Sequence, residues 1–255
     1  MSAATVTSKT GRAFNLAEQV RSGNVRAVSR LITLLESQHP DGTEALRLLT
    51  PDARPRSVIG VTGYPGAGKS TLVNELVRAY RDRGMKVGVL AVDVSSALTG
   101  GALLGDRIRM QEHAIDPGVY IRSMATRGTQ GGLARTTDAA RLVLEAAGYD
   151  VVLIETVGVG QNEADILTIA PTVVAVVAPG LGDEVQAMKA GLLETAHIIV
   201  VNKIDHPGAV CTLRDLREWC PIVIGTVATS GEGLPELLSA IVAHQSKQGF
   251  ASHSH

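Results

Sequence analysis

One stretch near residue 60 constrains this chain more than any other. An apolar, β-branched run, Val58–Val61, leads into Gly63-Tyr64-Pro65-Gly66-Ala67-Gly68-Lys69-Ser70-Thr71, and a helical pattern of apolar residues follows at 72–80. The string is Gly-x-x-x-x-Gly-Lys-Ser in the strand, loop and helix context that this motif requires. Its glycines let successive backbone N–H groups point at phosphate oxygens at the start of a helix. The pattern predicts a phosphate-binding loop that uses residues 63–71 to hold a nucleotide.

Two side chains of this loop have predicted chemical roles. Lys69 is expected to reach the β- and γ-phosphates, and the Ser70 hydroxyl is expected to bind Mg²⁺. The alternative is a glycine-rich turn that matches by accident, and the flanking strand and helix argue against it. The glycine spacing also differs from the dinucleotide-binding Gly-x-Gly-x-x-Gly pattern.

Composition limits the classes of protein to consider. A chain of 255 residues, 45% hydrophobic and 19% charged, has room for one sizeable α/β domain with a small appendage. Its formal net charge of −1 gives no electrostatic case for nucleic acid or a membrane surface. No apolar run approaches the ~20 residues of a membrane span. The two cysteines, Cys211 and Cys220, are expected to be buried thiols in a reducing compartment, so we expect a cytoplasmic protein.

Short runs rich in Val and Ile recur along the chain after the phosphate loop. Most are separated by helix-length segments, and they lie at 86–92, 151–154, 173–177, 198–201 and 222–224. This alternation predicts an α/β fold with a doubly wound, mostly parallel sheet. Ahead of the loop, residues 15–50 show helical spacing that is broken at Gly23-Asn24, with a capping-box pattern at Asp41 and Glu44.

The carboxyl ends of parallel strands are where ligands bind, so polar residues there carry the most information. Asn202-Lys203-Ile204-Asp205 directly follows the run at 198–201 and matches the guanine-recognition motif of GTPases. Its aspartate accepts hydrogen bonds from the N1–H and the amine of guanine, whereas adenine would leave that carboxylate unpaired. The alternative is a plain turn at a strand end. We therefore expect Asn202, Lys203 and Asp205 to select GTP over ATP.

Thr226-Val227-Ala228 follows the last predicted strand, where GTPases usually place a Ser-Ala loop against the base. Since Val227 stands in place of the serine, any base contact there would come from the backbone.

Acidic residues end two other strands. Asp93 closes the second, and Glu155 closes the third within Glu155-Thr156-Val157-Gly158. We expect Glu155 to hold Mg²⁺ through water or to orient the attacking water, and the N–H of Gly158 to meet the γ-phosphate. Gln161 is a second candidate for positioning that water, with a plain loop amide as its equal alternative.

Several stretches, taken in order, resemble one family. They are the phosphate loop, residues 93–110, residues 155–161, residues 179–189 and Asn202–Asp205. Over about residues 15–243 the chain is similar to the MeaB/ArgK family of P-loop GTPases, which have a SIMIBI-type G domain. These are G-protein chaperones of adenosylcobalamin-dependent methylmalonyl-CoA mutase and related acyl-CoA mutases. We expect a disordered tail at 1–14, a helical extension at 15–50, a GTPase domain at 56–243 and a polar tail at 244–255.

The resemblance implies roles for further residues. It places Asp93 and Asp106 near Mg²⁺, and makes 94–110 a mobile loop that senses the γ-phosphate. It also implies a third switch that signals to the mutase through Asp183, Glu184, Gln186 and Lys189. Without the resemblance, that stretch reads as a solvated helix start.

Two departures from the family pattern limit which family properties can be expected of this chain. Val94 and Ala97-Leu98 stand where relatives commonly have prolines or an aromatic residue. The family's C-terminal dimerisation arm is also expected to be absent, so a homodimer would have to form through other surfaces.

The function implied is slow GTP hydrolysis that gates cofactor loading or protection of the mutase. Lys69, Asp93, Glu155 and Gly158 are the expected catalytic residues, and Mg²⁺ and GTP or GDP the expected ligands. The mutase would supply the cobalamin site, because no Asp-x-His-x-x-Gly signature occurs in this chain. The alternatives are a nickel-insertion-type metallocentre GTPase, a transport-associated kinase under the ArgK label, and a nucleotide-dependent binding module with negligible hydrolysis.

Overall fold

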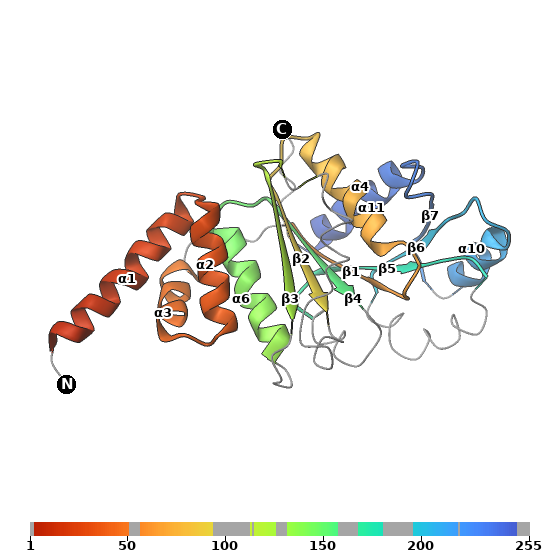
Figure 1. Ribbon diagram of the computed structural model, residues 1–255. Coiled ribbons are helices and arrows are strands. Elements are labelled where there is room, and N and C mark those ends of the chain that lie inside the picture. The colour runs from red at the N-terminus through yellow and green to blue at the C-terminus, as the bar shows by residue number, and fades with distance from the viewer. Residues whose placement is uncertain are drawn as a thin grey trace.

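A single parallel sheet organises the molecule (Figure 1). The computed structural model describes residues 3–50, 57–93, 113, 115–125, 132–157, 168–180, 196–218 and 220–248. Within them lies a seven-stranded sheet of order β3-β2-β4-β1-β5-β6-β7. Each neighbouring pair of strands is parallel. The predicted α/β fold with a doubly wound parallel sheet is confirmed.

The strands are β1 (Ser57–Gly63), β2 (Val87–Asp93), β3 (Val119–Ala125), β4 (Val151–Val157), β5 (Thr172–Val177), β6 (Ile198–Asn202) and β7 (Val223–Thr226). The helices are α1 (Ala3–Arg21), α2 (Val25–Glu36), α3 (Pro40–Leu49), α4 (Lys69–Arg81), α6 (Gly132–Ala146), α10 (Ala209–Arg217) and α11 (Leu234–Lys247). No helix in the described ranges is long and apolar enough to cross a membrane.

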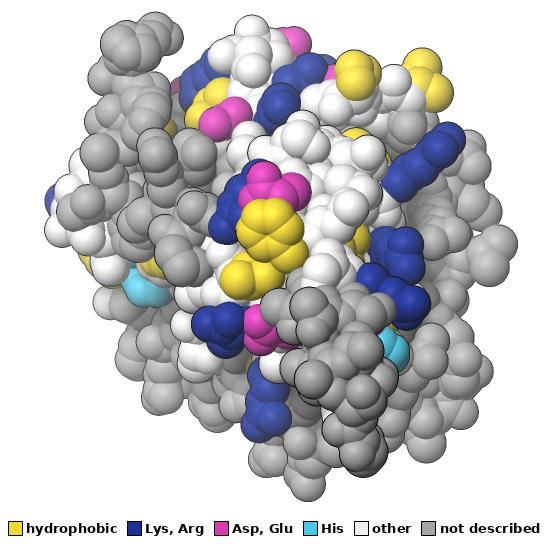
Figure 2. Space-filling model, turned by 90° about the vertical axis from the view of Figure 1, so that its left-hand side faces the viewer, with side chains coloured by type: hydrophobic (Ala, Val, Ile, Leu, Met, Phe, Trp, Pro, Cys, Tyr) yellow, Lys and Arg dark blue, Asp and Glu magenta, His cyan; other side chains and the backbone are white. Residues whose placement is uncertain are grey.

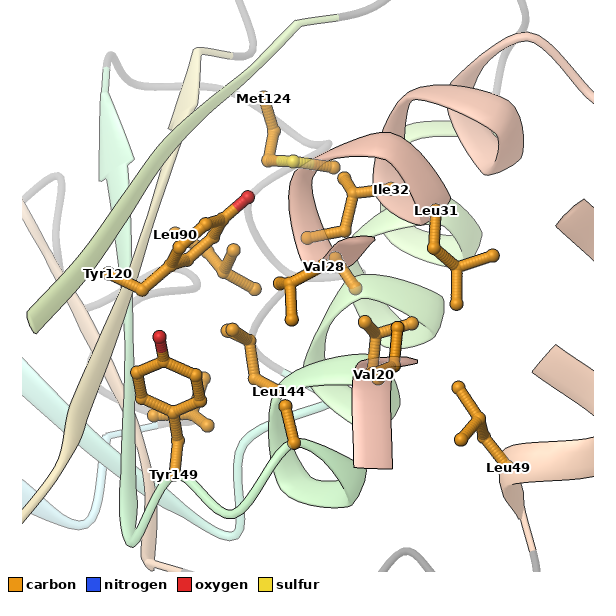
Figure 3. Close-up of a cluster of buried hydrophobic side chains, with 14 of the residues drawn as sticks. Val20, Val28, Leu31, Ile32, Leu49, Leu90, Tyr120, Met124, Leu144 and Tyr149 are labelled. Carbon is orange, nitrogen blue, oxygen red and sulfur yellow. The ribbon is translucent and has the colours of Figure 1, made fainter. Parts of the chain in front are cut away.

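Helices cover both faces of the sheet. On one face α4 and α11 pack over alternate residues of the central strands, such as Leu153 and Val174. On the other face α6 and the three N-terminal helices share one core with β2, β3 and β4. Figure 3 shows this core, with Val28 and Leu144 lying toward Leu90 of the sheet and Leu31 lying on the side of Val20 and Leu49. The α10 helix packs beside β6 and β7.

Polar contacts also fix the N-terminal helices to the edge strand β3. The Ser29 and Tyr120 hydroxyls lie 3.3 Å apart. Arg122 of β3 forms an ion pair with Glu36 and donates to the Thr33 hydroxyl at 3.1 Å. Since Ser29, Glu36 and Arg122 are partly buried, their contacts add to the apolar packing of α2. Residues 15–50 are therefore part of the core of the sheet domain.

The outer surface of the N-terminal helices carries charges of both signs (Figure 2). Neighbouring charges on one helix pair with each other, as in Arg21 with Glu18 and Arg47 with Glu44. Exposed pairs of this kind stabilise a helix only slightly. This surface is a solvated face with single exposed apolar residues such as Phe14.

Two boundaries differ from the sequence expectation. The α1 helix begins at Ala3, although a disordered tail was expected over 1–14. Its buried stripe is Ala13, Leu16, Ala17 and Val20, and the two alanines make that stripe a weak apolar signal. At the other end, α11 continues to Lys247 rather than giving way to a tail at 244, because Gln245 is buried against β1.

Two local expectations were wrong, the capping box at Asp41 and Glu44 and the burial of Cys211, and one strand was not expected. The N-cap of α3 is His39 rather than Asp41, because the His39 Nδ1 accepts from the Asp41 N–H and Pro40 occupies the first turn. Glu44 pairs with Arg47 instead of closing a capping box. Cys211 is exposed on α10, whereas Cys220 is buried as expected. The strand β3 was not anticipated, because Arg122 and Ser123 interrupt its apolar run.

We expect Leu31→Ala to lower the free energy of unfolding by about 2–5 kcal/mol, because Leu31 is fully buried between α2 and its neighbours. Urea unfolding followed by circular dichroism would measure the loss. The matched control is Arg30→Ala, an exposed position on the same helix, for which the change should stay within about 0.5 kcal/mol. A separate early transition for the N-terminal helices alone would contradict the shared core.

Candidate functional site

The candidate site lies where the carboxyl ends of the strands meet. The β1 strand runs between β4 and β5, and its last residue, Gly63, is in register with Val176 of β5. The loop from 63 to 68 then crosses this edge and passes into α4 at Lys69. The turn after β6 and the loop after β7 leave from the same edge, since these strands are parallel to β1. The sequence-predicted phosphate and base segments are thus neighbours.

The conformation of the phosphate loop depends on glycine. Gly63 has φ +138°, and a Cβ there would lie 2.0 Å from the carbonyl oxygen of Val176. Gly66 has φ +79°, and no atom lies within 4 Å of where its Cβ would be. A side chain there would fit in space, and its cost would be backbone strain alone. The N-cap residue of α4 is Gly68, which has no side chain to cap the helix. A helix start that lacks a side-chain cap on its N-cap residue suits a phosphate.

Lys69 folds back across this loop. Its Nζ donates to the carbonyl oxygens of Gly63 at 2.6 Å and Tyr64 at 3.0 Å, and the residue is 8% exposed. The ammonium group is thus held over the loop by backbone oxygens. Its position puts a positive charge in the loop beside the start of α4.

Ser70 and Glu155 come together from α4 and β4. The Ser70 hydroxyl donates to the Glu155 Oε1 at 2.6 Å, and Glu155 is 2% exposed. Glu155 shares a sheet face with Leu153, which packs under α4. A hydroxyl and a carboxylate are the oxygen ligands that Mg²⁺ prefers, and Mg²⁺ usually takes its other ligands from water and phosphates. These two residues therefore fit a magnesium site beside the phosphate loop.

Asn202 connects the phosphate loop to the base segment. Its Nδ2 donates to the Ala67 carbonyl at 2.9 Å, and its Oδ1 accepts from the Thr226 hydroxyl at 3.1 Å and the Ala228 N–H at 3.0 Å. The side chain passes where a Cβ on Gly68 would stand, 2.2 Å from the Asn202 Nδ2. Asn202 is 2% exposed. One buried amide thus joins three segments of the site.

Lys203 makes a second link from the same turn. Its Nζ donates to the Gly66 carbonyl at 2.8 Å, and its backbone has φ +62°, which is uncommon for a residue with a side chain. The Ile204 N–H donates to the Thr226 carbonyl at 3.1 Å, which holds the turn against β7. Asn202 and Lys203 were expected to contact the base, and their bonds to the phosphate loop were not expected. The carbonyl groups of a glycine-rich loop need partners, and that need is the signal that points to such links.

Asp205 behaves differently from its two neighbours in the motif. Its side chain is 57% exposed, and the His206 Nε2 lies 4.0 Å from the carboxylate. A ligand can therefore reach the carboxylate. Base recognition by Asp205 needs such access, and it stays a prediction.

Two backbone N–H groups of the loop after β7 already form hydrogen bonds within the protein. The Val227 N–H donates to the Glu232 carbonyl at 3.0 Å, and the Ala228 N–H donates to Asn202. The side chains of Val227 and Ala228 are both buried. Contact of this loop with the base stays a prediction, and these two N–H groups are not available for it in this conformation.

Several predicted site residues lie outside the described residues. They are Gly158, Gln161, Asp106, the segment 94–110, Asp183, Glu184, Gln186 and Lys189. For Asp93, the backbone ends β2 at the same edge as the phosphate loop, and its side chain is likewise not described. Their roles remain predictions.

Known proteins resemble this chain over most of its length. Residues 28–253 match the family described as Methylmalonyl Co-A mutase-associated GTPase MeaB. The chain is 51% identical over 243 residues to a putative GTPase of Pyrococcus abyssi, covering 90% of this chain and 75% of that protein. It is 37% identical to the Escherichia coli GTPase ArgK, covering 88% and 73% respectively. A crystal structure of an LAO/AO transport system kinase superposes with TM-score 0.71 at 28% identity, covering 98% of this chain and 79% of that one.

We expect Gly63→Ala and Gly66→Ala to differ in their cost to stability. Gly66→Ala should lower the free energy of unfolding by about 1–3 kcal/mol, through backbone strain alone. Gly63→Ala should cost at least about 3 kcal/mol, because its Cβ also collides with the Val176 carbonyl. Urea unfolding of the nucleotide-free chain measures both, and equal costs would contradict the close packing of the loop on β5.

Proposed function

Because this chain belongs to the family of methylmalonyl-CoA mutase-associated GTPases, we propose that it is a GTPase that serves as the G-protein chaperone of an adenosylcobalamin-dependent acyl-CoA mutase. The observation that carries the proposal is the joining of the phosphate loop to the Asn-Lys-x-Asp turn. The Asn202 and Lys203 side chains bond to the carbonyls of Ala67 and Gly66. A phosphate site and a guanine site are thereby held in one fixed relation.

Hydrolysis of GTP needs the terminal phosphate to be positioned and its charge to be neutralised. In the proposed mechanism the N–H groups of residues 63–71 bind the phosphate oxygens. The Lys69 ammonium leaves its carbonyl partners at Gly63 and Tyr64 for the β- and γ-phosphates. Ser70 and Glu155 would hold Mg²⁺, which neutralises charge that develops on the phosphate oxygens. Glu155 acts through water in this scheme, either on the metal or on the attacking water.

The base is read by Asp205. An exposed carboxylate at the tip of the turn accepts from the N1–H and the amine of guanine. The backbone of the turn is fixed by the Ile204 N–H and by the two side chains that precede it. Such fixing lowers the conformational entropy that binding must remove.

We propose further that the nucleotide state controls loading or protection of the mutase cofactor. The switch residues of this proposal are the segment 94–110 with Asp106, and Asp183, Glu184, Gln186 and Lys189. In the sequence these residues follow β2 and β5, whose carboxyl ends lie at the edge of the proposed nucleotide site. A γ-phosphate that orders one such segment would change the surface presented to the mutase.

Both cysteines are free thiols, which supports a cytoplasmic location.

Asp205→Asn should lower GTP affinity by about 100-fold or more, because two hydrogen bonds to a charged acceptor are lost at roughly 1.5–3 kcal/mol each. The variant should gain affinity for XTP, since xanthine carries a carbonyl where guanine carries the amine. Calorimetric titration with GTP, ATP and XTP checks both expectations. Asp215→Asn on α10 is the matched control, an exposed aspartate paired only with its neighbour Arg214 among the contacts described, and it should leave affinity unchanged. Unaltered GTP selectivity of Asp205→Asn would remove the base-reading role.

The mutase proposal is tested by GTP turnover with and without an adenosylcobalamin-dependent acyl-CoA mutase, together with a pull-down in each nucleotide state. We expect the mutase to bind in one nucleotide state and to change the turnover rate. Lys69→Ala should lose turnover in both conditions. Normal GTP hydrolysis that responds to no such mutase would leave the nucleotide site standing and reject the chaperone role.

A further inference from the structure

A pair of histidines lies at the edge of the sheet opposite the nucleotide site. His197 comes just before β6, and His244 lies in the last turn of α11. Their ring centroids are 4.4 Å apart, with planes inclined at 43°. Both rings stand beside Thr172 and Val173, the first residues of β5. The pair therefore bridges α11 and the amino ends of two central strands.

Hydrogen bonds hold each ring in place. The Val173 N–H donates to the His197 Nδ1 at 3.0 Å, and the His197 backbone N–H donates to the Val173 carbonyl at 2.9 Å. The His244 Nδ1 and the Thr172 hydroxyl lie 3.0 Å apart. The next residue of the helix, Gln245, exchanges hydrogen bonds with the Ser57 hydroxyl at 2.8 and 3.0 Å. The last turn of α11 is thus fastened to β1 and β5.

The contact with Val173 determines the protonation state of His197. A backbone N–H can only donate, so the His197 Nδ1 must offer its lone pair. The ring is therefore neutral, with its proton on Nε2. Neither nitrogen of the His197 ring then has a free lone pair to bind a metal. The two histidines therefore do not form a metal site together. Protonation would place two donors face to face at 3.0 Å and break this hydrogen bond.

The surroundings of the pair disfavour positive charge. Burial lowers the pKa of His197. The pKa of His244 is lowered by burial first, and then by the neighbouring His197 and by Lys247 on the same helix. Thr172 on β5 and Ser57 on β1 are uncharged. No carboxylate within the described part of the chain contributes to either pKa.

We propose that His197 and His244 form an acid-sensitive clasp, which fixes the last turn of α11 to the amino end of β5 while both rings are neutral and releases it when they are protonated. The clasp lies far along the strands from the phosphate loop, so its release affects α11 before it affects nucleotide contacts. Gln245 and Ser57 are uncharged and keep their hydrogen bonds across the same pH range.

The direction of the pH effect follows from linkage. Both pKa values are lower in the folded protein than in the unfolded chain, where histidine titrates near 6.5. The contribution of the clasp is fully present above about pH 6.5 and falls as pH decreases toward the folded-state values. Within that window each histidine can raise the opening equilibrium by up to about tenfold per pH unit.

Hydrogen exchange on the full chain tests the clasp at pH 7.5 and pH 5.5, after correction for intrinsic exchange rates. We expect protection of the Val173 amide and of the last turn of α11 to fall by about tenfold or more at the lower pH. The double substitution His197→Asn and His244→Asn should remove most of this loss, because the asparagine Oδ1 accepts as the Nδ1 does and does not titrate. His39→Asn is the control, since asparagine also caps α3 well, and it should keep the wild-type pH dependence.

An equal loss of protection in the double variant, or none in the wild type, would overturn the proposal. If the double variant does not fold, imidazole titration of the wild-type chain by NMR decides the question. Midpoints below 6.5 for both His197 and His244 support the clasp, and midpoints at or above 6.5 reject it.

Discussion

The buried amide of Asn202 is the contact on which the geometry of the candidate site depends. It reaches from the end of β6 to the phosphate loop after β1 on one side and to the loop after β7 on the other. Between β1 and β6 lies β5, so no sheet hydrogen bond connects these loops directly. A hydrogen-bonded amide in a buried position is strengthened by its surroundings and costly to break. The close approach at Gly68 is what lets the amide span the gap.

Around this centre, the two faces of the sheet have different tasks. The face under α4 carries the Ser70 and Glu155 pair and the start of the helix that is proposed to bind phosphate. The opposite face joins the N-terminal helices to β3 and α6. Between them, the strands are almost wholly buried, which gives the site a rigid base. The candidate site residues and the N-terminal helices that stabilise the fold thus lie on opposite faces of the same sheet.

The sequence was most informative where chemistry demands particular residues. The phosphate loop, Asn202–Asp205 and Glu155 were located from motif and strand context, and the buried strands from their runs of Val and Ile. The sequence was less informative where the local pattern is weak and the structure depends on contacts between residues that are far apart in the chain. The β3 strand was missed because Arg122 and Ser123 interrupt its apolar run, and Arg122 is accommodated by its contact with α2. His39 was missed as a cap because histidine is a rare one. The second role of Asn202 and the pairing of His197 with His244 depend on neighbours that are far apart in sequence, so only the fold reveals them.

The shared core of the N-terminal helices and α6 bears on how the chain is made. The α1–α3 layer is synthesised before the strands and the helix that cover its apolar side, and α6 follows about a hundred residues later, which corresponds to roughly 5–20 s of translation. Until β2, β3 and α6 have been made, Val28, Leu31 and Ile32 lack part of their native core. A nascent chain with an exposed apolar helix face is a substrate for holding chaperones. The N-terminal layer, which stabilises the finished protein, is therefore exposed to aggregation during synthesis.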